Sequence, residues 1–327
     1  MKLLQGGKKR RRASKWLALA AIGVAPLAVG VAAWATLHGR HKHSGPSVPV
    51  ATHSLHQHAR PARKRRQPKP APLVRLGSVD AFRFRFHRPP KAAFLVDLDK
   101  GDVLWRFHPL RRLPIASLTK IMTALLVTER AAPEERVRIP RAALNYQGSG
   151  IGVLRRGKRV RLETLMNGLL LVSGNDAAIA LAVHVAGTQR RFVRLMNRRA
   201  RAWGLRCTHY VDSHGLAPGN RSCARDLAIL ARLAMANRRI RRIVRRRQVR
   251  FRFPVKGRRV VWVGHNPLIR AHYRGAIGLK TGFTDEAGRC LVGVAKRHGR
   301  TLAVVLLNSP NPVKHAAKLL NKGFAHE

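Results

Sequence analysis

The sequence is poor in acidic residues. Its 327 residues include 14 Asp and Glu against 66 Lys and Arg, a formal net charge of +52. No acidic residue precedes Asp80, whereas residues 1–79 carry 16 Lys and Arg. Three interpretations fit this charge: a nucleic-acid partner, an anionic membrane or cell-wall polymer, or an arginine-rich composition spread over a solvated surface. We favour the third, because extreme charge alone indicates neither a fold nor a site.

Cysteines are also scarce. There are three, Cys207, Cys223 and Cys290, and none forms the closely spaced pair typical of zinc sites. An odd number excludes a complete disulfide framework within one chain, and the pairing of Cys207 with Cys223 stays open. Cys290 lies in an apolar stretch, which predicts a small buried residue on a strand. We expect neither a metal nor a cofactor.

One uncharged run, residues 16–37, is long enough to span a bilayer. It follows a basic cluster at residues 8–15, which keeps the N-terminus cytoplasmic. Its length favours an uncleaved anchor, whereas Ala33-Trp34-Ala35 is typical of a signal-peptide cleavage site. We predict that residues 1–37 are a signal peptide or a membrane anchor, and that the remainder is exported to the extracytoplasmic side of the plasma membrane.

The next segment, residues 38–80, is rich in His, Pro, Lys and Arg and has no hydrophobic period. It predicts a disordered cationic linker. Its six histidines imply no fixed ligand geometry, so we interpret them as polar linker residues. A folded domain is then expected to span residues 81–327.

Hydrophobic patterning within that domain predicts both strands and helices. Strands are expected at residues 92–98, 103–107, 260–263, 276–279, 290–295 and 302–307, and helices at 117–130, 164–171, 177–185, 226–236 and 313–322. Strands at both ends with helices between them predict an α/β (α+β) fold, an antiparallel sheet with an inserted helical subdomain. We interpret the arginine-dense stretch 238–250 as a solvated helix end that runs into a strand. The alternative is a binding site for polyanions.

Three motifs fit one serine active site: Ser117-Leu-Thr-Lys120, Ser173-Gly-Asn175 and Lys280-Thr281-Gly282. A serine hydroxyl is a weak nucleophile until a base removes its proton. Lys120 follows Ser117 by three residues, which places both side chains on one face of a helix. Lysine is a useful base when burial or a neighbouring cation, for which Lys280 is the candidate, lowers its pKa. Taken alone, Ser117 could equally be a helix cap and Lys120 a surface residue.

The other two motifs each have a functional and a structural interpretation. Ser173 and Asn175 lie in a predicted loop between two buried helices, where they can serve catalysis, cap the following helix, or do both. Lys280 and Thr281 end a predicted strand and offer a cation and a hydroxyl to a carboxylate. Gly282 lets a peptide approach the strand edge, and its structural alternative is a simple exit from strand to turn.

These motifs, together with Ser213-His-Gly-Leu216 and the stretch after Gly278, resemble the serine D-alanyl-D-alanine carboxypeptidases and endopeptidases, the low-molecular-weight penicillin-binding proteins. The resemblance covers roughly residues 92–320. It implies a five-stranded antiparallel sheet, a helical subdomain and a site between them. It also implies cleavage of the terminal D-Ala from peptidoglycan stem peptides through an acyl-enzyme, with β-lactams as acylating inhibitors.

The resemblance also implies a role for each motif residue. Ser117 would be the acylated nucleophile and Lys120 the general base, with Ser173 and Asn175 as the second motif. Lys280, Thr281 and Gly282 would bind the substrate. The backbone N–H groups of Ser117 and Phe283 would form the oxyanion hole.

Several alternatives remain. Many such carboxypeptidases continue into a further β domain, whereas this chain ends soon after its last predicted helix. In this it resembles both the shorter endopeptidases that cut cross-links and some Gram-positive carboxypeptidases, so the choice between the two activities stays open. A serine β-lactamase shares the motifs but needs a base for deacylation, for which Glu163 is the candidate. The non-enzyme alternative is a polyanion-binding wall protein. Expected partners are peptidoglycan, the membrane through residues 1–37 and anionic wall polymers, rather than nucleic acid.

Overall fold

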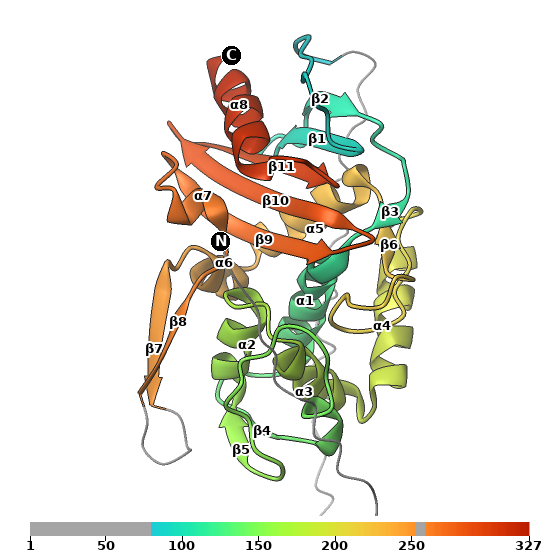
Figure 1. Ribbon diagram of the computed structural model, residues 1–327, viewed down its shortest axis with the longest axis vertical. Coiled ribbons are helices and arrows are strands. Elements are labelled where there is room, and N and C mark those ends of the chain that lie inside the picture. The colour runs from blue at the N-terminus through green and yellow to red at the C-terminus, as the bar shows by residue number, and fades with distance from the viewer. Residues whose placement is uncertain (1–79, 253–258, 327) are drawn as a thin grey trace, which may run out of the picture. The chain divides into compact units, whose positions relative to one another are not determined.

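A five-stranded antiparallel sheet is the central feature of the computed structural model, which describes residues 80–252 and 259–326 (Figure 1). The strand order is β2-β1-β11-β10-β9. The strands are β1 (Ala92–Asp97), β2 (Val103–Phe107), β9 (Ala276–Thr284), β10 (Gly288–Arg297) and β11 (Arg300–Leu307). Both ends of the catalytic domain thus contribute to one sheet, as the sequence predicts.

The central strands are apolar on both faces because helices cover both. Successive side chains of a strand point to opposite faces. On β11, Leu302, Val304 and Leu306 belong to the core that α8 (Pro312–Ala325) completes. Ala303 and Val305 belong to the other core, which includes α5 (Ala224–Ala236).

The helical region lies beside the edge strand β9 (Figure 1). It comprises the 3-10 helix η1 (Ala116–Thr119) and helices α1 (Lys120–Arg130), α2 (Leu162–Leu170), α3 (Asn175–Ala186), α4 (Gln189–Ala202) and α6 (Arg238–Val244). Helix α3 is buried along its first eight residues, which explains why its sequence is apolar on all sides. Because η1 packs against β9, the start of α1 lies at the junction of helices and sheet.

Short elements complete the described part of the chain. They are β3 (Leu113–Pro114) paired with β6 (Arg221–Ser222), β4 (Arg136–Arg138) with β5 (Arg159–Arg161), β7 (Gln248–Arg252) with β8 (Arg259–Val263), the 3-10 helix η2 (Arg141–Ala143) and the short helix α7 (Pro267–Arg270). The stretch 238–250 is confirmed as a helix followed by a strand.

Most predicted elements have limits within three residues of those in the structure, and two differences bear on the motifs. The helix predicted over residues 117–130 begins as η1, and only Lys120 starts the α-helix. The strand predicted over 276–279 continues to Thr284. Lys280-Thr281-Gly282 therefore lies inside β9 and does not end it, because pairing with β10 extends the strand beyond its apolar run.

No helix within residues 80–252 and 259–326 is long and apolar enough to cross a membrane. The predicted signal or anchor at residues 1–37 and nearly all of the predicted linker lie outside the described residues. The boundaries at residues 37 and 80 stay predictions.

Candidate active site

Lys120 lies against three oxygen atoms at the start of α1. Its Nζ is 2.9 Å from Ser117 Oγ, 2.7 Å from Asn175 Oδ1 and 2.7 Å from the His214 carbonyl oxygen. Ser117 and Lys120 are one turn apart, as their spacing predicts. Lys120 is fully buried, so the alternative of a surface lysine is wrong.

Two of the partners of Lys120 can hold its amine in either protonation state. The Asn175 amide is oriented by its own nitrogen, which donates to the Gln147 carbonyl oxygen at 2.7 Å, so Oδ1 faces Lys120. Asn175 Oδ1 and the His214 carbonyl oxygen can only accept hydrogen bonds, and together they take both N–H groups of a neutral amine. In the structure Lys120 Nζ donates to Ser117 Oγ, and in the neutral amine the lone pair would take the place of that N–H and face the hydroxyl, which is the arrangement a general base requires.

The surroundings lower the pKa of Lys120 well below that of a free lysine. Burial is the main cause, and the positive charge of Lys280 adds to it. The carboxylates of Asp212 and Asp176 act in the opposite direction. The expectation that burial and the Lys280 charge together activate Lys120 is in accord with this balance.

A second pair joins the sheet to the helical region. Lys280 Nζ donates to Ser173 Oγ at 3.0 Å and to the Thr281 carbonyl oxygen at 2.8 Å. Ser173 lies in the loop between α2 and α3, as predicted, in a left-handed conformation with φ of 61°. Gly174 is the N-cap of α3, and no side chain caps that end, so the interpretation of Ser173 or Asn175 as a helix cap is wrong.

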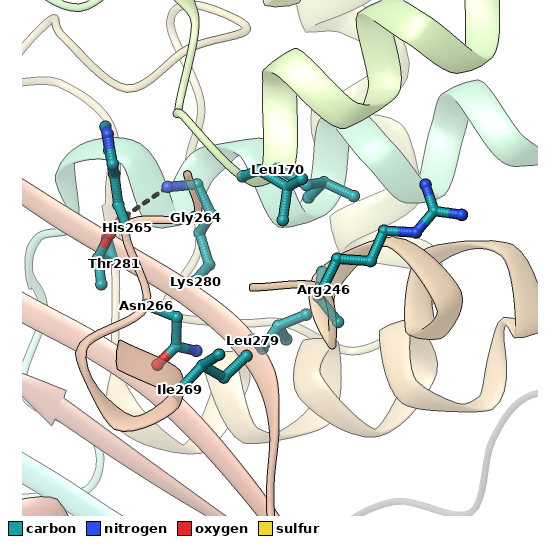
Figure 2. A pocket seen from close by; sticks show the side chains of 11 residues that line it. Leu170, Arg246, Gly264, His265, Asn266, Ile269, Leu279, Lys280 and Thr281 are labelled. Carbon is teal, nitrogen blue, oxygen red and sulfur yellow. Dashed lines mark hydrogen bonds between the residues drawn. The ribbon is translucent and has the colours of Figure 1, made fainter. Parts of the chain in front are cut away.

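Figure 2 shows the surroundings of Lys280, where a cavity of about 10 Å³ lies beside its side chain. The apolar side chains of Leu170, Ile269 and Leu279 contribute to the lining, together with His265 and Thr281. Burial in this setting lowers the pKa of Lys280 to about 7. Lys280 therefore exchanges its proton near neutral pH.

Two glycines let separate segments meet at Ser117. A Cβ on Gly282 would lie 3.0 Å from the Ile115 carbonyl oxygen and 3.1 Å from the Ser117 nitrogen. A Cβ on Gly215, which has φ of 90°, would overlap the Ala116 carbonyl oxygen. Gly282 thus permits β9 to approach the turn that carries Ser117, in addition to the substrate access that the sequence predicts.

Two aspartates orient this site, and neither was assigned a role from the sequence. Asp212 accepts hydrogen bonds from the backbone N–H groups of His214, at 2.8 Å, Gly215 and Ala217, at 2.8 Å. This folds the loop so that the His214 carbonyl oxygen points at Lys120. Only the stretch Ser213-His-Gly-Leu216, which carries part of the family resemblance, marked this loop in the sequence.

Asp176 has a similar role on the other side of Asn175. Its carboxylate accepts from the backbone N–H groups of Ile151, at 2.9 Å, and Gly152, at 3.3 Å. The Asn175 backbone N–H donates to the Ser149 carbonyl oxygen at 2.8 Å. These bonds hold residues 147–152 against the start of α3. A signal existed in the sequence, since Asp176 directly follows the second motif in an otherwise apolar stretch.

Cys207 and Cys223 form a disulfide that closes the loop carrying Asp212 and His214. With Asp226 they are the only described group of three potential metal ligands close together, and the disulfide occupies both sulfur atoms. Cys290 is buried on β10, as predicted.

Glu163 does not take part in the site. It lies in the first turn of α2, and its Oε2 accepts from Arg239 Nε at 2.6 Å. The other end of α2 leads to the loop that carries Ser173. At a rise of 1.5 Å per residue, the two ends of this nine-residue helix are roughly 12 Å apart. A deacylation base at Glu163, as the β-lactamase alternative requires, is not supported by this geometry.

Phe283 is 62% exposed on β9, next to Gly282. In the sheet it lies opposite Arg289 of β10. The oxyanion role of the Ser117 and Phe283 N–H groups stays a prediction.

Comparison with known proteins places this site in a family context. A family model described as D-alanyl-D-alanine carboxypeptidase matches residues 87–311. The D-alanyl-D-alanine carboxypeptidase DacF of Bacillus subtilis is 32% identical over 244 residues, which cover 72% of this chain and 62% of that protein. A D-alanyl-D-alanine endopeptidase of Pseudomonas aeruginosa is 32% identical over 234 residues, covering 69% of this chain and 73% of that protein.

Solved structures share the fold. A serine-to-alanine mutant of the Streptomyces K15 DD-transpeptidase superposes with a TM-score of 0.69 at 31% sequence identity, covering 74% of this chain and all of that one. The chain spans about six tenths of the length of the first curated relatives it matches.

Proposed function

We propose, for a chain that belongs to the D-alanyl-D-alanine carboxypeptidase family, that it is a serine carboxypeptidase acting on peptidoglycan. It removes the terminal D-Ala of stem peptides through an acyl-enzyme. The observation that carries this proposal is the 2.9 Å contact between the buried Lys120 Nζ and Ser117 Oγ. A buried lysine with a lowered pKa is the base that a serine nucleophile requires.

The first step is the attack of Ser117 on the carbonyl of the penultimate D-Ala. Neutral Lys120 takes the hydroxyl proton while Asn175 and His214 hold its amine in place. The backbone N–H groups of Ser117 and Phe283 stabilise the developing oxyanion. The C–N bond breaks, and an ester to Ser117 remains.

The leaving amine must gain a proton as it departs. Ser173 Oγ is the group we assign to this transfer, because it joins Lys280 by the 3.0 Å hydrogen bond and lies on the helical side of the site. The proton that Lys120 took from Ser117 replaces the one that Ser173 gives up, so both groups return to their starting states. Water then attacks the ester with neutral Lys120 as base, the proton returns to Ser117 Oγ, and the shortened peptide is released.

Lys280 and Thr281 bind the terminal carboxylate. A protonated lysine and a hydroxyl on an edge strand provide charge-assisted hydrogen bonds to that group. The substrate then lies along β9, which has β10 on only one side within the sheet.

Cleavage of cross-links is the second candidate function, favoured by the similarity to the Pseudomonas aeruginosa endopeptidase. Digestion of purified muropeptides separates the two, because a carboxypeptidase releases free D-Ala from pentapeptides and an endopeptidase converts dimers to monomers. We expect loss of one D-Ala mass from monomeric pentapeptides, abolished in Ser117→Ala. Conversion of dimers without release of D-Ala would contradict the carboxypeptidase assignment.

The remaining alternatives have less support. Against a β-lactamase, we expect β-lactams to acylate Ser117 and the resulting ester to hydrolyse slowly. Glu163, the candidate deacylation base of a β-lactamase, is held by Arg239 and is not available. A polyanion-binding protein without activity needs neither a buried Lys120 nor its three oxygen partners.

We propose an extracytoplasmic location, since the substrate is the cell wall. Residues 1–37 supply the export signal and either anchor the protein or are removed. N-terminal sequencing of the native protein decides between these. A start within the first residues indicates an anchor, and a start near Thr36 indicates cleavage.

A further inference from the structure

A second cavity, of about 480 Å³, opens outside the Ser117 site. Helices α5 and α6 and strands β9 and β10 contribute to its walls. This volume falls within the range of small-molecule sites in proteins, about 300–1,000 Å³. It shares β9 with the candidate active site, since Ile277 lines this cavity and Lys280 lies three residues further along the strand.

Four cations from three elements converge on the cavity. Arg241 and Arg245 come from the end of α6, Arg232 from α5 and Lys296 from β10. Arg241 and Arg245 lie one helical turn apart on the same side of α6. Among the described residues, no carboxylate lies within 4.0 Å of the cationic groups of Arg241, Arg245 or Lys296. These three charges are therefore not neutralised within the described part of the fold.

Backbone contacts hold two of the guanidinium groups in position. Arg241 Nη1 donates to the Met235 carbonyl oxygen at 2.7 Å, and Arg232 Nη2 donates to the Asp99 carbonyl oxygen at 3.1 Å. A guanidinium has five N–H donors, so this single bond of Arg241 leaves others for a ligand. Fixing a guanidinium in this way reduces the entropy that binding would cost.

One acidic residue, Asp99, lines the cavity with the four cations. Its Oδ2 accepts a hydrogen bond from the Thr301 backbone N–H at 2.7 Å, so this oxygen already has a partner within the fold. Four positive charges against one negative charge leave the cavity with a net charge of +3. Leu98, Ile277 and Met235 add apolar surface beside the charges.

We propose that this cavity binds a phosphate ester, as found in a phosphodiester polymer or a phospholipid headgroup. The guanidinium fork matches phosphate oxygens in a bidentate manner, and Lys296 adds a point charge. The apolar residues fit the carbon chain between successive phosphates. This site is independent of the proposed peptidase activity, because none of its residues contacts Ser117 or Lys120 in the described hydrogen-bond networks.

The test must separate this cavity from the general positive charge of the chain. Helix α4 provides the matched control, because Arg190, Arg194 and Arg198 are exposed at four-residue intervals along one side of it. They carry the same formal charge as Arg241, Arg245 and Lys296. An attraction that depends only on charge would treat both sets alike.

The experiment measures how fast phenylglyoxal modifies each arginine of the full chain in a neutral detergent. Peptide mass spectrometry after digestion identifies the modified arginines. The Ser117→Ala variant is used, so the result does not depend on catalysis. Glycerol phosphate oligomers at ten times their Kd are expected to slow modification of Arg241 and Arg245 about tenfold, by simple occupancy. Modification of Arg194 and Arg198 is expected to stay unchanged.

Two triple variants complete the test. Arg241→Gln/Arg245→Gln/Lys296→Gln should abolish the protection of Arg232 by the oligomer, whereas Arg190→Gln/Arg194→Gln/Arg198→Gln should preserve it. Phosphatidylglycerol vesicles, compared with phosphatidylcholine vesicles, identify a lipid source if they protect better than the soluble oligomer. Equal protection of cavity and α4 arginines, no protection by either phosphate probe, or equal protection by polyglutamate would overturn the proposal.

Discussion

Lys280 donates a hydrogen bond to Ser173 Oγ at 3.0 Å, although 107 positions separate the two residues. The contact joins edge strand β9 to the loop between α2 and α3. It places a cation whose pKa burial lowers to about 7 inside the candidate site. The same charge lowers the pKa of Lys120, so the two lysines are linked in their protonation.

The first prediction is a bell-shaped pH profile of kcat/KM. As pH falls through the lowered pKa of Lys120, this base gains a proton and activity is lost. As pH rises through about 7, Lys280 loses its charge and holds the carboxylate less well. We expect the alkaline limb to be missing with a substrate whose terminal carboxylate is amidated. The same limb with both substrates would contradict the assignment of Lys280.

The second prediction concerns carboxylate recognition by Lys280. Amidation of the terminal carboxylate should reduce kcat/KM in the wild type much more than in Lys280→Ala, because the variant has already lost the cation that the carboxylate would pair with. Steady-state kinetics on the four combinations measure the coupling. Additive losses would show that Lys280 and the carboxylate do not interact.

The third prediction concerns Lys120→Arg. Arginine keeps the positive charge but does not deprotonate at usable pH, so it cannot act as a base. We expect the rate of β-lactam acylation to fall by about 10²–10⁴, which is typical of a lost general base. Stopped-flow measurement with a chromogenic β-lactam provides the rate, and circular dichroism controls for folding. A rate near that of the wild type would make Lys120 a structural residue.

The fourth prediction concerns the close approach at Gly215. A methyl group there would overlap the Ala116 carbonyl oxygen, directly before Ser117. Gly157→Ala is the matched control, because Gly157 also has a positive φ, of 76°, and nothing lies within 4 Å of its Cβ position. The control should lose about 1–2 kcal/mol of unfolding free energy, the cost of a left-handed alanine.

Gly215→Ala should lose more unfolding free energy than the control and should also acylate at least about tenfold more slowly, since displacing Ser117 disturbs the reacting geometry. Urea unfolding and acylation rates measure the two effects. If both variants keep the wild-type acylation rate, the approach of Gly215 does not position Ser117.

Much of the fold could be predicted from local patterns in the sequence. The alternation and apolar runs at β1, β10 and β11 indicated the sheet, because strands covered on both faces are apolar throughout. The full length of β9 could not be predicted in this way. Its second half, from Lys280 to Thr284, is held by pairing with β10, which a local pattern does not contain.

The part of the candidate site that could be predicted consists of the residues whose side chains belong to a sequence motif. The motifs predicted a single site, and in the structure their side chains form two hydrogen-bond networks. One joins Lys120 to Ser117 and Asn175, and the other joins Lys280 to Ser173. The contribution of His214 is a carbonyl oxygen, which any residue type supplies, so its identity carried no signal. Asp212 acts through backbone N–H groups, and that role depends on a loop conformation that only the folded chain defines.

The central claim is that Ser117 is a nucleophile activated by Lys120. Intact-mass spectrometry after incubation with benzylpenicillin tests it most directly. We predict a single adduct with the mass of the antibiotic, located on the peptide that contains Ser117 and absent from Ser117→Ala. A folded wild-type protein that forms no adduct, or an adduct that persists in Ser117→Ala, would contradict the account.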